Sequence, residues 1–137
     1  PKPYEIPIAK KRAEILKDAL ANGATVEELR RNDIGRESVL PILKEACKEQ
    51  NKAYSVIDGF PIPLQHVRII KVKAPETEIV LASDGYPRLM PTLRESEKEL
   101  ERLLAEDPLC IGDNIATKGL KVGQKSFDDR SYIRLTS

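Results

Sequence analysis

Aspartates that follow apolar runs are the residues of this sequence best suited to chemistry. Asp58-Gly59 follows Val56-Ile57, and Asp84-Gly85 follows the apolar residues 79–82. A glycine directly after the acid can adopt positive φ, so the chain can turn away and leave the carboxylate at the end of a rigid strand. Such a carboxylate suits a hard cation. The alternative is that each aspartate caps its own turn through a side-chain to backbone bond.

A further acidic pair, Asp128-Asp129, comes directly before the strand-like residues 131–135. Mg²⁺ and Mn²⁺ prefer carboxylate oxygens, with several waters completing the coordination shell. If the fold brings Asp84 and Asp128 together, we expect them to form a site for such a cation. The alternative is a solvated acidic turn with Arg130 as its counter-charge.

The composition excludes most other chemistries. The chain has 137 residues, with the single histidine His66 and the two cysteines Cys47 and Cys110. One histidine excludes multi-histidine metal sites and most Ser-His or Cys-His arrangements, and we expect His66 to be a partly exposed strand residue. The cysteines are too few for a disulfide framework and lie in no Cys-x-x-Cys pair, so we expect both as buried thiols.

The charge balance and hydropathy restrict the partners. Basic residues number 23 and acidic residues 22, a net charge of +1 that attracts neither nucleic acid nor an anionic membrane. Nucleic-acid binding remains an alternative only through the lysine cluster Lys118, Lys121 and Lys125. No aromatic residues lie between these lysines to stack on bases. The apolar runs are much shorter than the roughly 20 residues that span a bilayer, so we expect a cytoplasmic protein without membrane contact.

The first half of the chain predicts three helices. Residues 1–7 are expected to be extended because they hold three prolines. Apolar residues at intervals of three and four predict a helix from Ile8 to a stop at Gly23, with Arg12 solvated on its lysine-rich face. A capping box, Thr25 with Glu28, predicts a short helix to about residue 32, and residues 33–35 are expected to break it.

A third helix is expected from Arg36 or Ser38 to Asn51, with Pro41 in its first turn. Its apolar stripe would comprise Leu40, Leu43, Ala46 and Cys47.

The second half predicts strands and one more helix. Residues 54–57, 66–72, 78–82 and 131–135 are β-prone, with a turn at 74–77 that would make a hairpin of 66–72 and a centrally buried 78–82. A second capping box, Thr92 with Glu95, predicts a helix to about Glu106, whose core face holds Leu93, Leu100, Leu103 and Leu104.

Residues 110–125 contain three glycines and are expected to form a mobile surface loop. Because helices and antiparallel strands occur in separate blocks, the sequence predicts an α+β fold with helices packed on a mainly antiparallel sheet.

Two segments resemble the PPM (type-2C) metal-dependent serine/threonine phosphatases. Residues 78–85, EIVLASDG, resemble the strand end of that family that carries a metal-binding aspartate. Residues 126–135, SFDDRSYIRL, are similar to its final motif, in which an aspartate-asparagine pair leads into a strand. The order of strand, Asp-Gly, helix, variable loop, acidic pair and closing strand agrees over residues 78–135.

The resemblance implies a partial phosphatase 2C-like sandwich in which Asp84 and Asp128 bind Mg²⁺ or Mn²⁺. The nucleophile would be a metal-activated water, and the substrate a phosphorylated protein or small phosphomonoester. Asp129 lies where the family has asparagine. Asp58 lies in a segment that is similar to an earlier glycine-aspartate segment of the family. Asp58 and Asp129 are therefore additional acidic candidates for the site.

The family's catalytic domain is longer than this chain. We therefore expect residues 1–137 to be a single domain, helical over 1–52 and phosphatase-like over 53–137, that belongs to a longer catalytic domain. Without the amino-terminal half of that domain, sheet edges and an apolar face would be uncovered and would favour self-association. The alternative is a non-catalytic binding or regulatory module that keeps the fold without a complete metal site.

Overall fold

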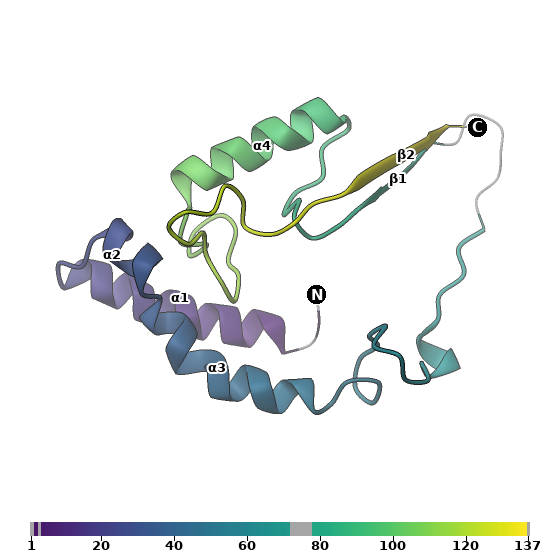
Figure 1. Ribbon diagram of the computed structural model, residues 1–137, viewed down its shortest axis with the longest axis horizontal. Helices are drawn as coiled ribbons and strands as arrows, with labels where there is room; N and C mark the ends of the chain where they lie inside the picture. Colours follow the sequence, from purple (N-terminus) through teal and green to yellow (C-terminus); the bar gives the residue numbers. More distant parts are fainter. Residues whose placement is uncertain (1, 3, 72–77, 137) are drawn as a thin grey trace.

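The computed structural model describes residues 2, 4–71 and 78–136. In chain order the elements are α1 (Glu5–Ala21), α2 (Val26–Arg31), α3 (Ile34–Cys47), the 3₁₀ turn η1 (Leu64–His66), β1 (Glu78–Ala82), α4 (Leu93–Glu106) and β2 (Tyr132–Thr136). Helices α1 to α3 lie together on one side, and α4 lies on the other side along the antiparallel pair of β1 and β2 (Figure 1). Helices beside a small antiparallel sheet confirm the expected α+β class.

Helix α1 begins earlier than expected. It starts at Glu5 and contains Pro7 in its first turn, where the missing N–H has no helical partner to lose. The expectation that residues 5–7 are extended is therefore wrong. The helix ends at Ala21, and Gly23 adopts φ +97°, the left-handed conformation that the predicted stop requires.

The predicted capping box at α2 is present. Thr25 accepts the N–H of Glu28, and the Glu28 carboxylate accepts the N–H of Thr25. Helix α2 ends before residue 33, as expected, but Ile34 and Gly35 already belong to α3, because Asp33 accepts the N–H of Arg36 at 2.7 Å and caps that helix. The expected start of α3 at Arg36 or Ser38 is therefore too late. An aspartate with a glycine two residues later fits both a turn and an N-cap, and here the cap forms.

Helix α3 packs against α1 through a face that the sequence analysis did not select. Gly35 and Val39 are buried, whereas Leu40 and Cys47 of the predicted stripe are exposed. A Cβ at position 35 would lie 2.9 Å from the backbone oxygen of Arg12, so the absence of a side chain allows the two helices to approach closely. The stripe was misplaced because a buried glycine does not contribute to an apolar pattern.

The partner of β1 is β2. The two strands are antiparallel, with Leu81 opposite Ile133 and Ala82 opposite Tyr132. Residues 67–71 form no strand, so the predicted hairpin with 66–72 is wrong for the described residues, and the predicted turn at 74–77 lies outside them. Leu81 and Ala82 are exposed, so the expectation of a strand buried on both faces is also wrong.

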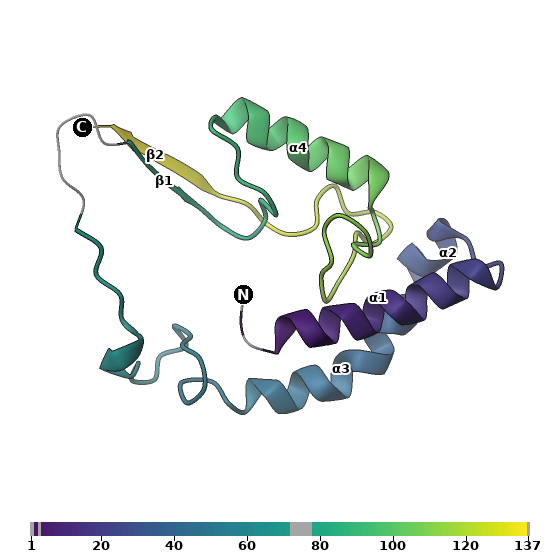
Figure 2. The ribbon, with the colours of Figure 1, turned by 180° about the vertical axis from the view of Figure 1, so that it is seen from behind.

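The connection from α3 to residue 71 extends away both from helices α1 to α3 and from α4 with its two strands (Figure 2). Residues 54–57 form no strand apart from an isolated bridge at Tyr54. His66 lies in η1, not in a strand, and its Nδ1 is 2.7 Å from the Ser55 hydroxyl. The large side chains here stay in solvent, and Ile57 and Ile69 are 95% and 83% exposed.

Two hydrophobic clusters meet at the segment after α4. Helix α4 has the predicted bounds and capping box, with Leu100 and Leu103 buried and Leu93 exposed, contrary to expectation. The first cluster is Tyr86, Leu100, Leu103, Cys110, Leu120 and Phe127. The second is Ala13, Leu16, Leu29, Leu109 and Ile111.

The segment at 110–125 is therefore more than a surface loop. Cys110, Ile111 and Leu120 are buried, which corrects that expectation. The Asp107 carboxylate accepts the N–H groups of Ile111, Gly112 and Asn114 at 2.9–3.0 Å. These three hydrogen bonds hold residues 107–114 in one conformation although they form no helix or strand after α4.

Arg12 joins the helical layer to this segment. Its side chain is 0% exposed, so the expectation that it is solvated is wrong. The guanidinium bonds both carboxylate oxygens of Asp33 and donates to the carbonyl oxygens of Cys110 and Ala116. All the charge on this buried residue is therefore compensated within the fold.

Candidate functional site

Ser83 holds the end of β1 against the start of β2. Its N–H donates to the carbonyl oxygen of Ser131 at 3.1 Å, and its hydroxyl accepts the N–H of Ser131 at 2.9 Å. The same hydroxyl donates to the carbonyl oxygen of Asp129 at 3.4 Å. The residue after Ser83 is therefore held beside the acidic pair that precedes β2.

Gly85 is required by close approach. It is buried, and a Cβ at this position would overlap the carbonyl oxygen of Asp129 and lie 2.7 Å from the Cβ of Arg130. Its φ is not positive, whereas Gly59 has φ +90°. The two Asp-Gly motifs thus differ: Gly59 allows a turn, and Gly85 allows two backbone segments to touch.

Asp84 and Asp128 line the same cavity, which we call the carboxylate cavity. It has a volume of about 320 Å³ and also receives Glu5 from the first turn of α1 and Asn114 from the segment after α4. Apolar walls from Ile6, Ala9, Ile115 and Phe127 complete it. The sequence analysis missed Glu5, because residues 1–7 were expected to be an extended lead-in.

Lys118 contacts Asp128 at the edge of this cavity. The Lys118 ammonium donates to Asp128 Oδ2, and the side chains of both residues are about 40% exposed. This hydrogen bond lowers the pKa of the Asp128 carboxyl, and the N–H of Asp129, 3.1 Å from Asp128 Oδ1, acts in the same direction. Asp128 is therefore ionised at neutral pH and already has a cationic partner.

A second and larger hollow, which we call the lysine cavity, adjoins the first. It has a volume of about 830 Å³, shares Lys118, Phe127 and Asp128 with the carboxylate cavity, and is also lined by Lys121 and Lys125. These three lysines form a cluster in the sequence, but no pattern in the sequence connects them with the aspartates.

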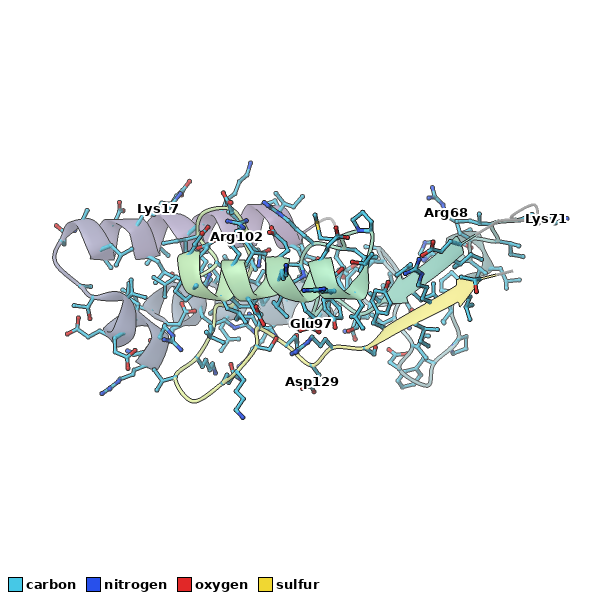
Figure 3. The ribbon with its side chains drawn as sticks, turned by 90° about the horizontal axis from the view of Figure 1, so that it is seen from above. Lys17, Arg68, Lys71, Glu97, Arg102 and Asp129 are labelled. Atoms are coloured by element: carbon cyan, nitrogen blue, oxygen red, sulfur yellow. The ribbon has the colours of Figure 1, made fainter. Side chains whose placement is uncertain are left out.

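Arg130 on the wall of the lysine cavity is neutralised by α4. Its guanidinium bonds both carboxylate oxygens of Glu97, at 3.0 and 3.1 Å, and this pairing lowers the pKa of Glu97. The Tyr86 hydroxyl donates to Glu97 at 2.5 Å, a bond that raises the pKa of Tyr86. Figure 3 shows Glu97 on the side of α4 that faces the segment before β2.

The two additional acidic candidates lie in other surroundings. Asp58 is exposed between α3 and η1, where its carboxylate accepts bonds from Asn51 Nδ2 and from the N–H of Phe60. It caps its own turn, as the alternative interpretation held. Asp129 lines the lysine cavity and its side chain points outward (Figure 3).

The chemistry of the donors fits a cation that keeps much of its water. Within residues 2, 4–71 and 78–136, no group of three or more His, Cys, Asp or Glu side chains is placed to hold a metal ion. Mg²⁺ is commonly bound through one or two carboxylates together with waters and substrate phosphate. Two carboxylates that line one cavity match that mode of binding.

No protein-family model, curated protein or solved structure matches this chain. In the described part of the chain, no helix is long and apolar enough to cross a membrane.

Proposed function

We propose that the chain belongs to a Mg²⁺- or Mn²⁺-dependent phosphomonoester hydrolase of the PPM (type-2C) class, which its sequence resembles. The observation that supports this proposal is the shared cavity of Asp84 and Asp128. These residues are far apart in the sequence, and each belongs to one of the two segments that carry the resemblance. The antiparallel pair of β1 and β2 would then be part of the larger phosphatase sandwich.

In this proposal, Asp84 and Asp128 hold the cation and leave its other positions to water and substrate. Asp84 and Asp128 would hold this cation, which would lower the pKa of a coordinated water and offset charge on the phosphoryl group. The water oxygen would form a bond to phosphorus as the ester P–O bond breaks, and a proton lost by that water would end on the leaving alkoxide, giving serine, threonine or another alcohol. A histidine or cysteine nucleophile is not required.

The substrate would be a phosphorylated protein or a small phosphomonoester. The lysine cavity next to Asp128 supports an anionic substrate, because Lys121 and Lys125 have no carboxylate partner among the described residues. Its volume of about 830 Å³ accommodates more than a phosphate group alone.

The test is hydrolysis of p-nitrophenyl phosphate with Mn²⁺ by the full protein and its variants. Asp84→Asn and Asp128→Asn each remove one anionic ligand and are expected to abolish metal-dependent turnover. Asp18→Asn, on the exposed face of α1, is the matched control and should leave turnover unchanged. Turnover that persists in both site variants would refute the assignment.

A second candidate is a non-catalytic binding or regulatory module with this fold. The observation that favours it is that no group of three or more His, Cys, Asp or Glu side chains in the described part of the chain is placed to hold a metal ion. Calorimetry with Mn²⁺ separates the candidates, because a folded sample that binds no Mn²⁺ supports the module and contradicts the hydrolase.

A further inference from the structure

We propose that Lys118 couples cation binding at Asp128 to phosphate binding in the lysine cavity. The inference rests on the proposed function and adds a positioning residue that selects dianionic phosphate. Its basis is the location of Lys118, which lines both cavities and contacts Asp128 between them.

In the structure, Lys118 occupies the position of a cation on Asp128. Its ammonium supplies one positive charge to Asp128 Oδ2 from a side chain that is 44% exposed. A divalent ion on the same carboxylate carries twice that charge and interacts with it more strongly at equal distance. Cation binding at Asp128 therefore displaces Lys118, and its long, flexible stem lets the ammonium turn into the adjoining cavity.

The displaced lysine changes the charge of the lysine cavity. Arg130 stays compensated by Glu97, at 3.0 and 3.1 Å, so it adds no free charge. The free cationic side chains become Lys118, Lys121 and Lys125, against the carboxylate of Asp129, because Glu97 is paired with Arg130 and Asp128 would hold the cation. A phosphate dianion provides the matching negative charge, and three ammonium groups can donate to its oxygens.

The coupling must act in both directions. A phosphate that holds Lys118 also removes the competitor from Asp128, so phosphate tightens cation binding by the same factor by which the cation tightens phosphate binding. The substrate and the cation would thus assemble together, and Asp128 would not lack a cationic partner at any stage.

The experiment measures free Mn²⁺ by electron paramagnetic resonance, with and without inorganic phosphate, and subtracts the Mn²⁺–phosphate complex formed in protein-free buffer. The wild-type protein should bind Mn²⁺ more tightly when phosphate is present. Lys118→Met should bind Mn²⁺ about two- to fivefold more tightly than wild type without phosphate, because a partly exposed ion pair contributes modestly. Phosphate should tighten Mn²⁺ binding less in this variant than in wild type, because only direct contact between phosphate and the cation then couples the two.

Two further variants make the result specific. Lys118→Arg keeps the charge and should retain the effect of phosphate, whereas Lys98→Met, on the exposed face of α4, removes a lysine elsewhere and should behave as wild type. If wild type and Lys118→Met respond equally to phosphate while Mn²⁺ binds, the coupling is overturned and the hydrolase proposal stands. If wild type binds no Mn²⁺, both are overturned.

Discussion

The guanidinium of Arg12 and the carboxylate of Asp33 form a buried ion pair between α1 and the N-terminus of α3. Arg12 Nη2 lies 2.7 Å from Asp33 Oδ2, and Arg12 Nε lies 3.0 Å from the same oxygen. Arg12 is 0% exposed. Its third guanidinium nitrogen, Nη1, donates to the carbonyl oxygens of Cys110 and Ala116, two residues that also line the carboxylate cavity. One residue of the helical layer thus positions a wall of the candidate site.

The loss of one partner of this pair should be strongly destabilising. Arg12→Met leaves the Asp33 carboxylate and two carbonyl oxygens without their donor, and we expect a loss of about 3–5 kcal/mol in the free energy of unfolding. Urea unfolding followed by circular dichroism measures it. Lys11→Met, an exposed position on the same helix, is the control. A loss below about 1 kcal/mol would mean that the pair is not desolvated as described.

A methyl group at position 85 should separate the two halves of the site. Gly85→Ala places a Cβ against the Asp129 carbonyl and the Arg130 Cβ, so β1 and β2 must shift apart at their ends. We expect a loss of about 1–3 kcal/mol in stability and weaker Mn²⁺ binding. Gly112→Ala is the control, because its Cβ would lie at an ordinary 3.5 Å from its nearest neighbours. Equal stability and Mn²⁺ affinity in the two variants would contradict the close approach.

The two thiols should differ in reactivity. Cys47 is exposed, which corrects its prediction as a buried thiol, whereas Cys110 is 1% exposed, and burial raises the pKa of its thiol to about 12. At pH 8 a disulfide reagent should titrate one thiol in the native protein and two in urea. Cys47→Ala should abolish the native reaction, and fast reaction of both thiols in the native state would contradict the burial of Cys110.

The same pKa shift predicts a dependence of stability on alkaline pH. Because the folded thiol of Cys110 has the higher pKa, its contribution to stability is complete below the unfolded value of 9.0 and is lost as pH rises toward 12. Between these values, Cys110→Ala should lose less unfolding free energy than Cys47→Ala. Parallel losses in the two variants would show that other groups control alkaline unfolding.

The exposed apolar side chains between α3 and β1 should promote self-association. Ile57, Leu64 and Ile69 are 95%, 85% and 83% exposed, so their substitution by serine costs the folded chain little. We expect the wild type to associate with increasing concentration in sedimentation velocity, and the triple serine variant to stay monomeric at an unchanged melting temperature. Val122→Ser, at 44% exposure in another segment, is the control. A wild type that is monomeric at every concentration would contradict the prediction.

Local signals in the sequence located α1 to α4, although not the first turns of α1 and α3, and the two strands among the described residues. The capping boxes of Thr25 and Thr92 and the stop at Gly23 are confirmed, because each depends on residues within one turn of the chain. The strands at 78–82 and near 131–135 were predicted from their own composition. The Asp-Gly and Asp-Asp motifs predict Asp84 and Asp128 as metal ligands, and the structure places both along one cavity.

Tertiary structure decided how these elements meet. β1 pairs with β2 and not with residues 67–71. The sequence did not predict this pairing, because a continuous apolar run specifies a strand without specifying its partner. Arg12 is buried because two carbonyl groups from a distant segment and Asp33 surround it, which no pattern within α1 reveals. Glu5, Asp84, Lys118 and Asp128 line one cavity although they come from four separate segments. Their relative positions depend on how the helices and strands pack together, which local propensity does not determine.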